Sequence, residues 1–471
     1  MEENVEFSLM LSLKEMARRR IASSLWNHSD IVALIRTCKF HSYLYSDKFR
    51  KGNILYDQMM GKVETLLLPI TLEDSLKETM HSVGFEILKF NSYQEKYIGE
   101  GNHFFDHEIK IYWTNLGTID KVRTAMSFVK KDIIDLTLRY KIACIYCLEH
   151  DVPILWEQMS EDERNISFNA DSLAMYQMLI YFWESEMKKE AFDFHGLSRI
   201  NNNVYVDALE YSAYNGNMAA TRCFFQKLTD NEKKVEALKI TRRVLKKIEF
   251  SKEYYFEVLQ FLLLQMSGKD RLSVFQTSSY NLLCCFMEWP LQPYFNGLAR
   301  LTWSYLAPSE FNDLLWHITI RNLEHKGDGW DYRSLFSGLW SDSPLHFKKY
   351  IILEEPWEHL LCHLYETGDI GSASLMLKMV TPEQVERFIT GNSGIHLSYS
   401  LSWAKKFCCL GACLEACIRS EKVGKKLKKN FEVFLATTID QKIGQAGEKS
   451  WEQFLTLLNA RISALAAKKI K

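Results

Sequence analysis

The chain has 471 residues, a length at which single hydrophobic cores usually stop growing, so we expect several domains or a stack of repeats. Lysine and arginine total 58 against 59 aspartate and glutamate residues, and this balance excludes a global electrostatic footprint for nucleic acid. Hydrophobic residues make up 47% of the chain, whereas only 21 glycines and 8 prolines interrupt it. This composition predicts an all-α protein, because glycine and proline disfavour helix interiors.

The ends and the cysteines bear on the compartment. The first residues, Met-Glu-Glu-Asn-Val-Glu, are acidic where a secretory signal is basic, and the longest apolar run, Ser172 to Trp183, is too short to span a bilayer. Eleven cysteines are scattered without regular spacing, which is typical of thiols in a reducing compartment. We therefore expect a cytoplasmic protein that does not bind membranes.

The first element is a helix between Leu9 and Leu25. Leu13, Ala17 and Ile21 recur at four-residue intervals, so they share one face of this helix. The stretch from Ser12 to Ile21 resembles the elongin-binding helix of SOCS boxes, with Ala17 where that family prefers cysteine. The resemblance implies that the stripe docks into a groove of elongin. An ordinary amphipathic first helix fits the same residues.

Three regions are expected along the chain. A less regular passage from Asn91 to Asn102 contains Gly99 and Gly101, which predicts a boundary that separates an N-terminal helical region, 1–100, from the repeats, 101–400. Beyond residue 400, Trp403 to Ile418 and Trp451 to Ile470 have helical patterns, and we expect 401–471 to form a C-terminal helical cap.

A recurring phrase marks helix starts in the middle region. An apolar residue precedes a serine or threonine, and an acidic or amide residue follows three positions later, as in a capping box. The caps are Ser160, Thr229, Ser267, Ser309 and Thr381, with Ser198 and Ser343 as candidates for two missing starts. Intervals of 69, 38, 42 and 72 residues between the five caps are consistent with a unit of about 37 residues, and such periods belong to helical solenoids.

The stretch from Ala208 to Phe225 combines a small-residue helix, the turn Asn215-Gly216-Asn217 and an apolar helix. The phrase recurs from Leu360 to Asp369, and Gly216 and Gly368 each lie 13 residues before a cap. A looser copy without the glycine runs from Ala143 to Asp151. These helix pairs resemble ankyrin repeats and are similar to arthropod ankyrin-like proteins, although the family's Thr-Pro-Leu-His opening and glycine-rich hairpin are absent. The resemblance implies an α-solenoid of helix-turn-helix repeats and no particular activity.

The leading functional prediction is a non-enzymatic scaffold for protein partners. In such a solenoid the inner helices and turns line an elongated surface, and aromatic and amide side chains suit protein recognition there. A structural role for the tyrosines is an equal alternative. The residues expected on the exposed side are Tyr211, Tyr214, Asn215, Asn217, His363 and Tyr365. The runner-up is a substrate receptor of an elongin-cullin ubiquitin ligase, which would use the first helix to recruit elongin.

A metal-dependent enzyme is the third alternative. Cys409, Cys413 and Cys417 share one helix face, Cys144 and Cys147 form a Cys-x-x-Cys, and two histidine groups fall at helical spacing, His103 with His107 and His359 with Cys362 and His363. None has the spacing of a zinc or His-Glu-x-x-His site, so packing is favoured in each case. No phosphate loop, dinucleotide fingerprint or nucleophile elbow occurs either. We therefore expect no catalytic residue, metal or cofactor.

Basic clusters offer local alternatives for an acidic partner. They are Arg18 to Arg20, the group from Lys239 to Lys247, and the group from Lys422 to Lys429. Each lies in a helical stretch, so we expect their charges to form solvated faces and predict no nucleic-acid binding.

Overall fold

The structure is a computed structural model and describes residues 11–37, 54–98, 110–166, 174–192, 194, 203–251, 255–324, 331–354, 356–438 and 445–468. Within these ranges the chain is all-helical and contains no β-strand, which confirms the expected all-α class. A single antiparallel bridge joins Trp113 and Ile119 in the loop before α6. None of the described helices has the length and apolarity that crossing a membrane requires.

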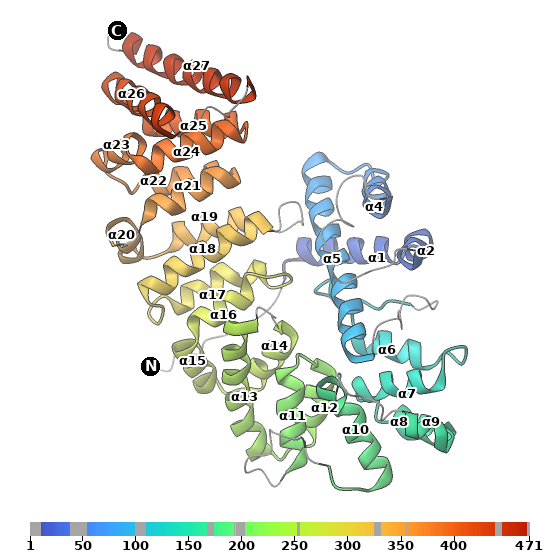
Figure 1. Cartoon of the computed structure of the whole chain (residues 1–471). Helices are drawn as coiled ribbons and strands as arrows, with labels where there is room; N and C mark the ends of the chain where they lie inside the picture. The colour runs from blue at the N-terminus through green and yellow to red at the C-terminus, as the bar shows by residue number, and fades with distance from the viewer. Residues whose placement is uncertain are drawn as a thin grey trace. The chain divides into compact units, whose positions relative to one another are not determined.

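The chain divides into two compact units, one up to Tyr294 and one formed by the described residues from Phe295 onwards (Figure 1). The first unit contains α1 (Leu13–Trp26), α2 (Ser29–Thr37), α4 (Ile54–Glu64), α5 (Ile70–Ile98), α6 (Lys121–Val129), α7 (Leu136–Ile145), α8 (Asp151–Gln158), α9 (Glu161–Ile166), α10 (Ala174–Lys188), α11 (Val204–Tyr214), α12 (Met218–Gln226), α13 (Asp230–Ser251), α14 (Phe256–Gln265), α15 (Gly268–Thr277) and α16 (Ser279–Phe286). This division differs from the boundaries expected near residues 100 and 400, which stay predictions.

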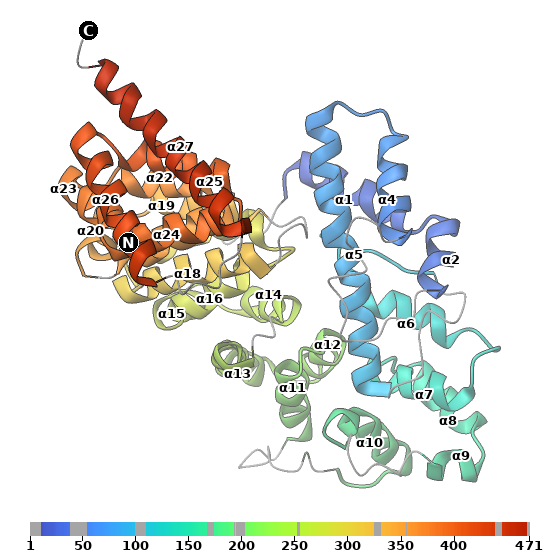
Figure 2. The same ribbon diagram turned by 45° about the horizontal axis from the view of Figure 1, so that its top comes forward.

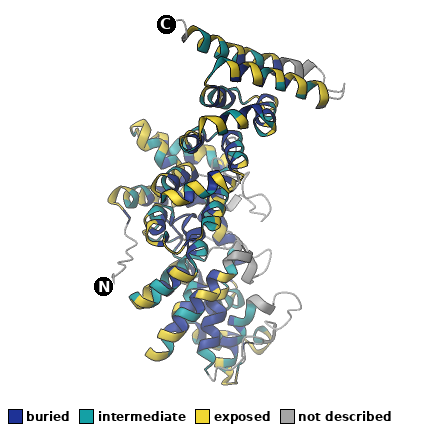
Figure 3. Cartoon of the chain, turned by 90° about the vertical axis from the view of Figure 1, so that its left-hand side faces the viewer, coloured by how far each residue is buried: buried dark blue, intermediate teal, exposed yellow. Residues whose placement is uncertain are grey.

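The second unit contains α17 (Phe295–Thr302), α18 (Pro308–Glu324), α19 (Tyr332–Asp342), α20 (Leu345–Leu353), α21 (Trp357–Thr367), α22 (Ile370–Leu377), α23 (Pro382–Thr390), α24 (Asn392–Trp403), α25 (Phe407–Cys417), α26 (Glu421–Thr438) and α27 (Gln445–Lys468). The helical pattern expected from Trp403 to Ile418 is broken by a turn between α24 and α25. In both units the buried residues line the faces where neighbouring helices meet (Figure 3).

The long helix α5 organises the start of the first unit, where α1 and α4 pack against it (Figure 2). Trp26 of α1 is fully buried, and its indole N–H donates to the carbonyl of Met80 at 2.9 Å. The prediction of a less regular passage from Asn91 is wrong as far as Ile98, because α5 continues to that residue. Buried Phe90 and Asn91 explain the continuation, since packing of this face overrides the weak local preference.

The same left-handed turn joins several consecutive helices. Cys147 after α7, Gly216 after α11, Gly368 after α21 and Lys405 after α24 have φ angles of 48°, 72°, 81° and 56°. The N–H of the next residue donates to the carbonyl five positions earlier, Leu148 to Ala143 at 2.9 Å, Asn217 to Ser212 at 2.9 Å, Asp369 to Leu364 at 2.8 Å and Lys406 to Leu401 at 2.8 Å. These bonds define a Schellman motif. They confirm that Gly216 and Gly368 lie in the turn after the first helix of each pair.

A third helix follows each of three such pairs at a fixed distance. Cys147, Gly216 and Gly368 each precede a cap by 13 residues, the caps being Ser160, Thr229 and Thr381. At all three caps the hydroxyl accepts the N–H of the third helical residue, and that residue's side chain accepts the cap's own N–H. The recurring unit is therefore helix, left-handed turn, helix, capping box and helix.

Several contacts in the second unit join helices that are not consecutive in the chain. Helices three places apart touch each other: α18 with α21, α21 with α24, α24 with α27, α19 with α22, α22 with α25, and α23 with α26. The corresponding helices α19, α22 and α25 begin at Tyr332, Ile370 and Phe407, which lie 38 and 37 residues apart.

Two of the expected caps are wrong, and one other gives only half a box. α18 begins at Pro308, so Ser309 lies inside the helix, and Glu310 instead accepts the N–H of Ala307 at 2.8 Å. Ser343 follows the end of α19, where its hydroxyl donates to the carbonyl of Trp340. Ser267 accepts the N–H of Asp270 but lacks the return bond. Ser198 lies outside the described residues.

Lys405 provides a test of the turn. It is exposed and holds a left-handed φ of 56°, which strains any residue with a Cβ. We expect Lys405→Gly to raise the free energy of unfolding by about 0.5 to 1 kcal/mol, because glycine adopts this conformation without strain. The gain is smaller than the relieved strain, since glycine loses more chain entropy on folding. Lys429→Gly, inside α26, is the control and should lower it by about 1 kcal/mol. Denaturant titration measures both, and a loss of stability at Lys405 would contradict the assignment.

Candidate functional site

The six residues expected on an exposed side fall into two groups. Tyr214 is 43% exposed, and Asn215 and His363 are half-buried. The expectation is wrong for the other three, because Tyr211, Asn217 and Tyr365 are buried. Tyr211 packs on the ring of Phe194 at 5.5 Å, and Tyr365 lies against the thiols of α25.

Asn217 is a structural link between neighbouring helix pairs. Its side-chain oxygen accepts the N–H of Ala220 at 3.0 Å and so caps α12, while its amide nitrogen donates to the carbonyl of Ile145 at 2.8 Å. That carbonyl belongs to the last residue of α7. The residue therefore ties the start of α12 to the end of α7, and this role explains its burial.

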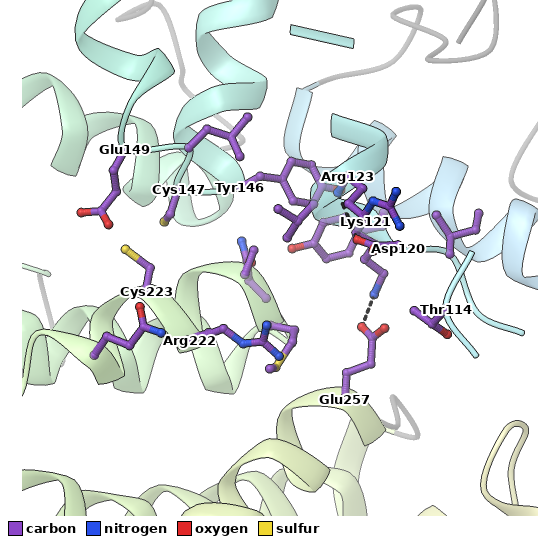
Figure 4. A pocket seen from close by; sticks show the side chains of 18 residues that line it. Thr114, Asp120, Lys121, Arg123, Tyr146, Cys147, Glu149, Arg222, Cys223 and Glu257 are labelled. Carbon is purple, nitrogen blue, oxygen red and sulfur yellow. Dashed lines mark hydrogen bonds and ion pairs between the residues drawn. The ribbon is translucent and has the colours of Figure 1, made fainter. Parts of the chain in front are cut away.

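A pocket of about 470 Å³ lies beside Asn217 in the first unit (Figure 4). Its walls come from α5 at Tyr93, the loop and first turn of α6, the turn between α7 and α8, one side of α12, and α14 at Glu257. The two turns that meet here, Tyr146 to Glu149 and Asn217 to Ala219, belong to two copies of the recurring unit. This pocket is the candidate functional site, because concave surfaces with a few polar groups are where ligands bind.

Ion pairs neutralise two of the acidic groups in the wall. Lys121 contacts Glu257 at 2.7 Å, and Lys227, just outside the lining, contacts Glu149 at 2.6 Å. Burial opposes the charged form of Lys121, but the Glu257 carboxylate outweighs it, so the pKa of Lys121 is raised. The third acid, Asp120, caps α6 by accepting the N–H of Arg123 at 3.0 Å. All the acids in the wall are thus engaged by the protein itself.

Two arginines of the lining differ from these acids. Arg222 is exposed, with its guanidinium 5.8 Å from the ring of Phe261, and Figure 4 shows it extending across the pocket on the side of Glu257. Arg123 is exposed at the rim, over the ring of Tyr112 at 4.6 Å. Among the residues that the structure describes, no carboxylate pairs with either guanidinium. The pocket therefore offers guanidinium donors that remain available to a ligand.

The residues of the first-helix stripe lie on one open face of α1. Leu13 is 82% exposed, Ile21 is 40% exposed, and Ala17 between them is also exposed. The opposite face carries Ala22 and Trp26 and packs against α5. The alternative, in which the stripe is the core-facing side of an ordinary amphipathic helix, is therefore wrong for these three residues.

The cysteine and histidine groups show no metal geometry within the described ranges, where no set of three His, Cys, Asp or Glu side chains is arranged to hold an ion. Burial raises the pKa of the Cys144 and Cys147 thiols, and it raises that of Cys362 to about 12. His363 lies 5.7 Å from the ring of Trp316. His103 and His107 lie outside the described residues.

Within the described part of the chain, only some residues of the basic clusters are exposed to solvent without a partner in the protein. Arg243 pairs with Glu210, and Lys247 donates to the carbonyl of Tyr214 at 2.7 Å and covers its ring. The expectation is wrong for Arg19, which is 1% exposed. Its guanidinium donates to two carbonyls and lies 4.0 Å from the ring of Trp289, so this charge is part of the core.

Sequence reasoning missed the arginine and lysine residues of the pocket. Lys121 and Arg123 stand in no motif, Arg222 lies in the ankyrin-like stretch without being marked by it, and Glu257 is more than a hundred residues from Lys121. Only Asn217 among the expected surface residues lines the pocket. A scan against protein-family models gives no match to this chain, and a search of curated proteins gives none either.

Proposed function

We propose that the chain is a non-enzymatic helical-repeat scaffold that binds a protein partner, with the pocket of the first unit as its binding site. The observation that carries the proposal is the recurring unit, in which a left-handed turn precedes a capping box by 13 residues at Cys147, Gly216 and Gly368. Repeat units that contact mainly their neighbours form extended stacks with long surfaces for partners. The cysteines of the described residues are free thiols, which supports a cytoplasmic setting.

The likeness to ankyrin repeats supports the solenoid in part. The helix pairs α11 with α12 and α21 with α22 have the left-handed glycine, and a capped second helix follows, as the resemblance implies. A third helix then stands where that family has a hairpin. We infer an α-solenoid whose unit has three helices.

The position of the pocket supports binding at turns. The α7–α8 and α11–α12 turns both contribute to its wall, as the surface of a repeat scaffold requires. The half-buried ring of Tyr93 adds aromatic contact area beside the charged groups. Such a combination of apolar walls and a few fixed polar groups suits recognition of a peptide segment.

Affinity capture from native lysate tests this proposal when wild type is compared with Ala219→Trp. Ala219 lines the pocket at the first turn of α12, and an indole there would fill the space. We expect a discrete protein partner with wild type and its loss with Ala219→Trp. Lys130→Glu, which alters an exposed residue at the other end of α6, is the control and should retain the partner. Equal capture by wild type and Ala219→Trp, or no partner at all, contradicts the proposal.

The exposed stripe of α1 favours a second candidate, a substrate receptor of an elongin-cullin ubiquitin ligase. Leu13, Ala17 and Ile21 stand open on one helix face at the spacing of an elongin-binding helix. In this version α1 recruits elongin and the pocket holds the substrate.

Leu13→Asp tests the second candidate. We expect co-purification of elongin with wild type and its loss with Leu13→Asp, because a charge would enter the apolar groove. The fold should stay intact, since Leu13 is 82% exposed. Leu67→Asp, at an 89% exposed leucine in the turn between α4 and α5, is the matched control. If elongin fails to bind wild type, the second candidate is wrong while the first stands.

A further inference from the structure

We infer that the pocket of the first unit binds a peptide through an acidic side chain, with Arg222 as the main donor and Arg123 as a second donor at the rim. This inference rests on the proposed function and adds the chemistry of the partner.

The wall favours a negative ligand, because lysines pair with two of its three acids and its two guanidiniums outweigh the charge of the third acid, Asp120. Glu257 pairs with Lys121 at 2.7 Å, Glu149 pairs with Lys227 at 2.6 Å, and Asp120 caps α6. Arg222 and Arg123 have no such carboxylate within the described residues. A ligand oxyanion could therefore bind these two guanidiniums without displacing a carboxylate of the protein.

The geometry of guanidinium selects the class of ligand. Its planar fork of N–H groups matches a carboxylate or phosphate with two parallel hydrogen bonds. The pocket volume of about 470 Å³ accommodates a few side chains of a peptide but not a folded domain. The half-buried ring of Tyr93 provides apolar contact for the residues beside the acid. We therefore assign an extended segment with a glutamate, an aspartate or a phosphorylated residue.

The ion pair between Glu257 and Lys121 allows an acidic side chain to approach Arg222. The Glu257 carboxylate lies on the side toward which Arg222 extends, and it would repel an incoming acid if Lys121 did not neutralise it (Figure 4). Lys121 is thus a positioning residue for this site. Its raised pKa keeps it protonated at neutral pH, so the neutralisation persists there.

A phage-displayed library of random nonapeptides, selected on the full chain, tests the inference. We expect the selected peptides to share an acidic position. For the tightest peptide, changing that acid to glutamine should weaken binding at least tenfold, and Arg222→Gln in the protein should do the same. The two changes together should weaken it no further than either alone, because both remove one contact. A phosphoserine version of the peptide distinguishes a preference for phosphate from one for carboxylate.

The controls separate this inference from the proposed function. Lys130→Glu should leave the affinity unchanged, while Ala219→Trp should abolish binding. Peptides that lose binding with Ala219→Trp but keep it with Arg222→Gln, or that carry no shared acid, overturn the inference and leave the scaffold proposal standing. Selection of no pocket-dependent peptide overturns the inference, and the scaffold proposal is then wrong only if lysate capture also yields no partner or yields the same partner with Ala219→Trp.

Discussion

Arg19→Ala is expected to lower the free energy of unfolding of the first unit by about 3 to 5 kcal/mol. The guanidinium donates to the carbonyl of Leu116 at 2.8 Å and to that of Pro290 at 3.2 Å. It thereby joins α1 to the loop before α6 and to the segment after α16. Alanine would leave both carbonyls without this donor and would open a cavity against the ring of Trp289.

The charge on Arg19 is retained although it is buried. Desolvation lowers its pKa to about 10, and the carboxylate of Glu15 opposes this effect. The group is therefore still charged at neutral pH, and its donors are held in place for the two carbonyls. A lysine at this position has three donors on a flexible stem and no planar face for the indole, so Arg19→Lys should recover only part of the loss.

Arg20 provides the matched control for Arg19. It is the next residue of the same helix and is exposed, so Arg20→Ala should change the free energy of unfolding by no more than about 0.5 kcal/mol. Denaturant unfolding followed by circular dichroism measures all three variants. Equal effects at Arg19 and Arg20 would contradict the buried position of Arg19.

Gly216→Ala is the second large effect, with an expected loss of about 2 to 5 kcal/mol. Two causes add here. A φ of 72° strains any residue with a Cβ by about 1 to 2 kcal/mol. That Cβ would also overlap the ring of Tyr255, and overpacking of this kind typically adds about 1 to 3 kcal/mol.

Gly368→Ala separates the two causes. Gly368 has a similar φ of 81°, but the nearest atoms to an added Cβ lie 3.8 Å away, which is ordinary contact. We therefore expect only the conformational part, about 1 to 2 kcal/mol. Thermal or denaturant unfolding of each variant gives the comparison. A smaller loss at Gly216 than at Gly368 would show that Tyr255 does not pack on this turn.

The sequence predicted the local elements well where the signal is local. Thr229 and Thr381 start helices because they form capping boxes. The threonine hydroxyl accepts the backbone N–H of the residue three positions later, and that residue's side chain accepts the threonine's own backbone N–H. Gly216 and Gly368 end helices because glycine takes the left-handed conformation without strain. Cys147 escaped this reasoning, since a cysteine carries no such preference and only the surrounding packing holds its φ at 48°.

Exposure was harder to predict than helix position. Tyr211 and Tyr365 were expected on the surface because tyrosine has a polar tip, but tyrosine is intermediate in burial and its ring suits a core equally well. Arg19 was expected in water with Arg18 and Arg20, and its buried carbonyl partners are Leu116 and Pro290, which the sequence separates widely.

The pocket itself was beyond the reach of sequence patterns. Tyr93, Lys121, Arg222 and Glu257 come from four helices, and no single motif contains more than one of them. Their proximity depends on how consecutive helix units pack, which a periodic pattern predicts only in outline. Ala208 to Phe225 nevertheless pointed to the correct neighbourhood, because Asn217 and Arg222 lie within it.

The affinity of the captured partner for the full chain tests the central claim most directly. Calorimetric titration should give at least tenfold weaker binding to Ala219→Trp than to wild type, with Lys130→Glu indistinguishable from wild type. Circular dichroism should show the same helical content in all three proteins. Equal affinity of wild type and Ala219→Trp would contradict the account, because the partner would then bind elsewhere on the chain.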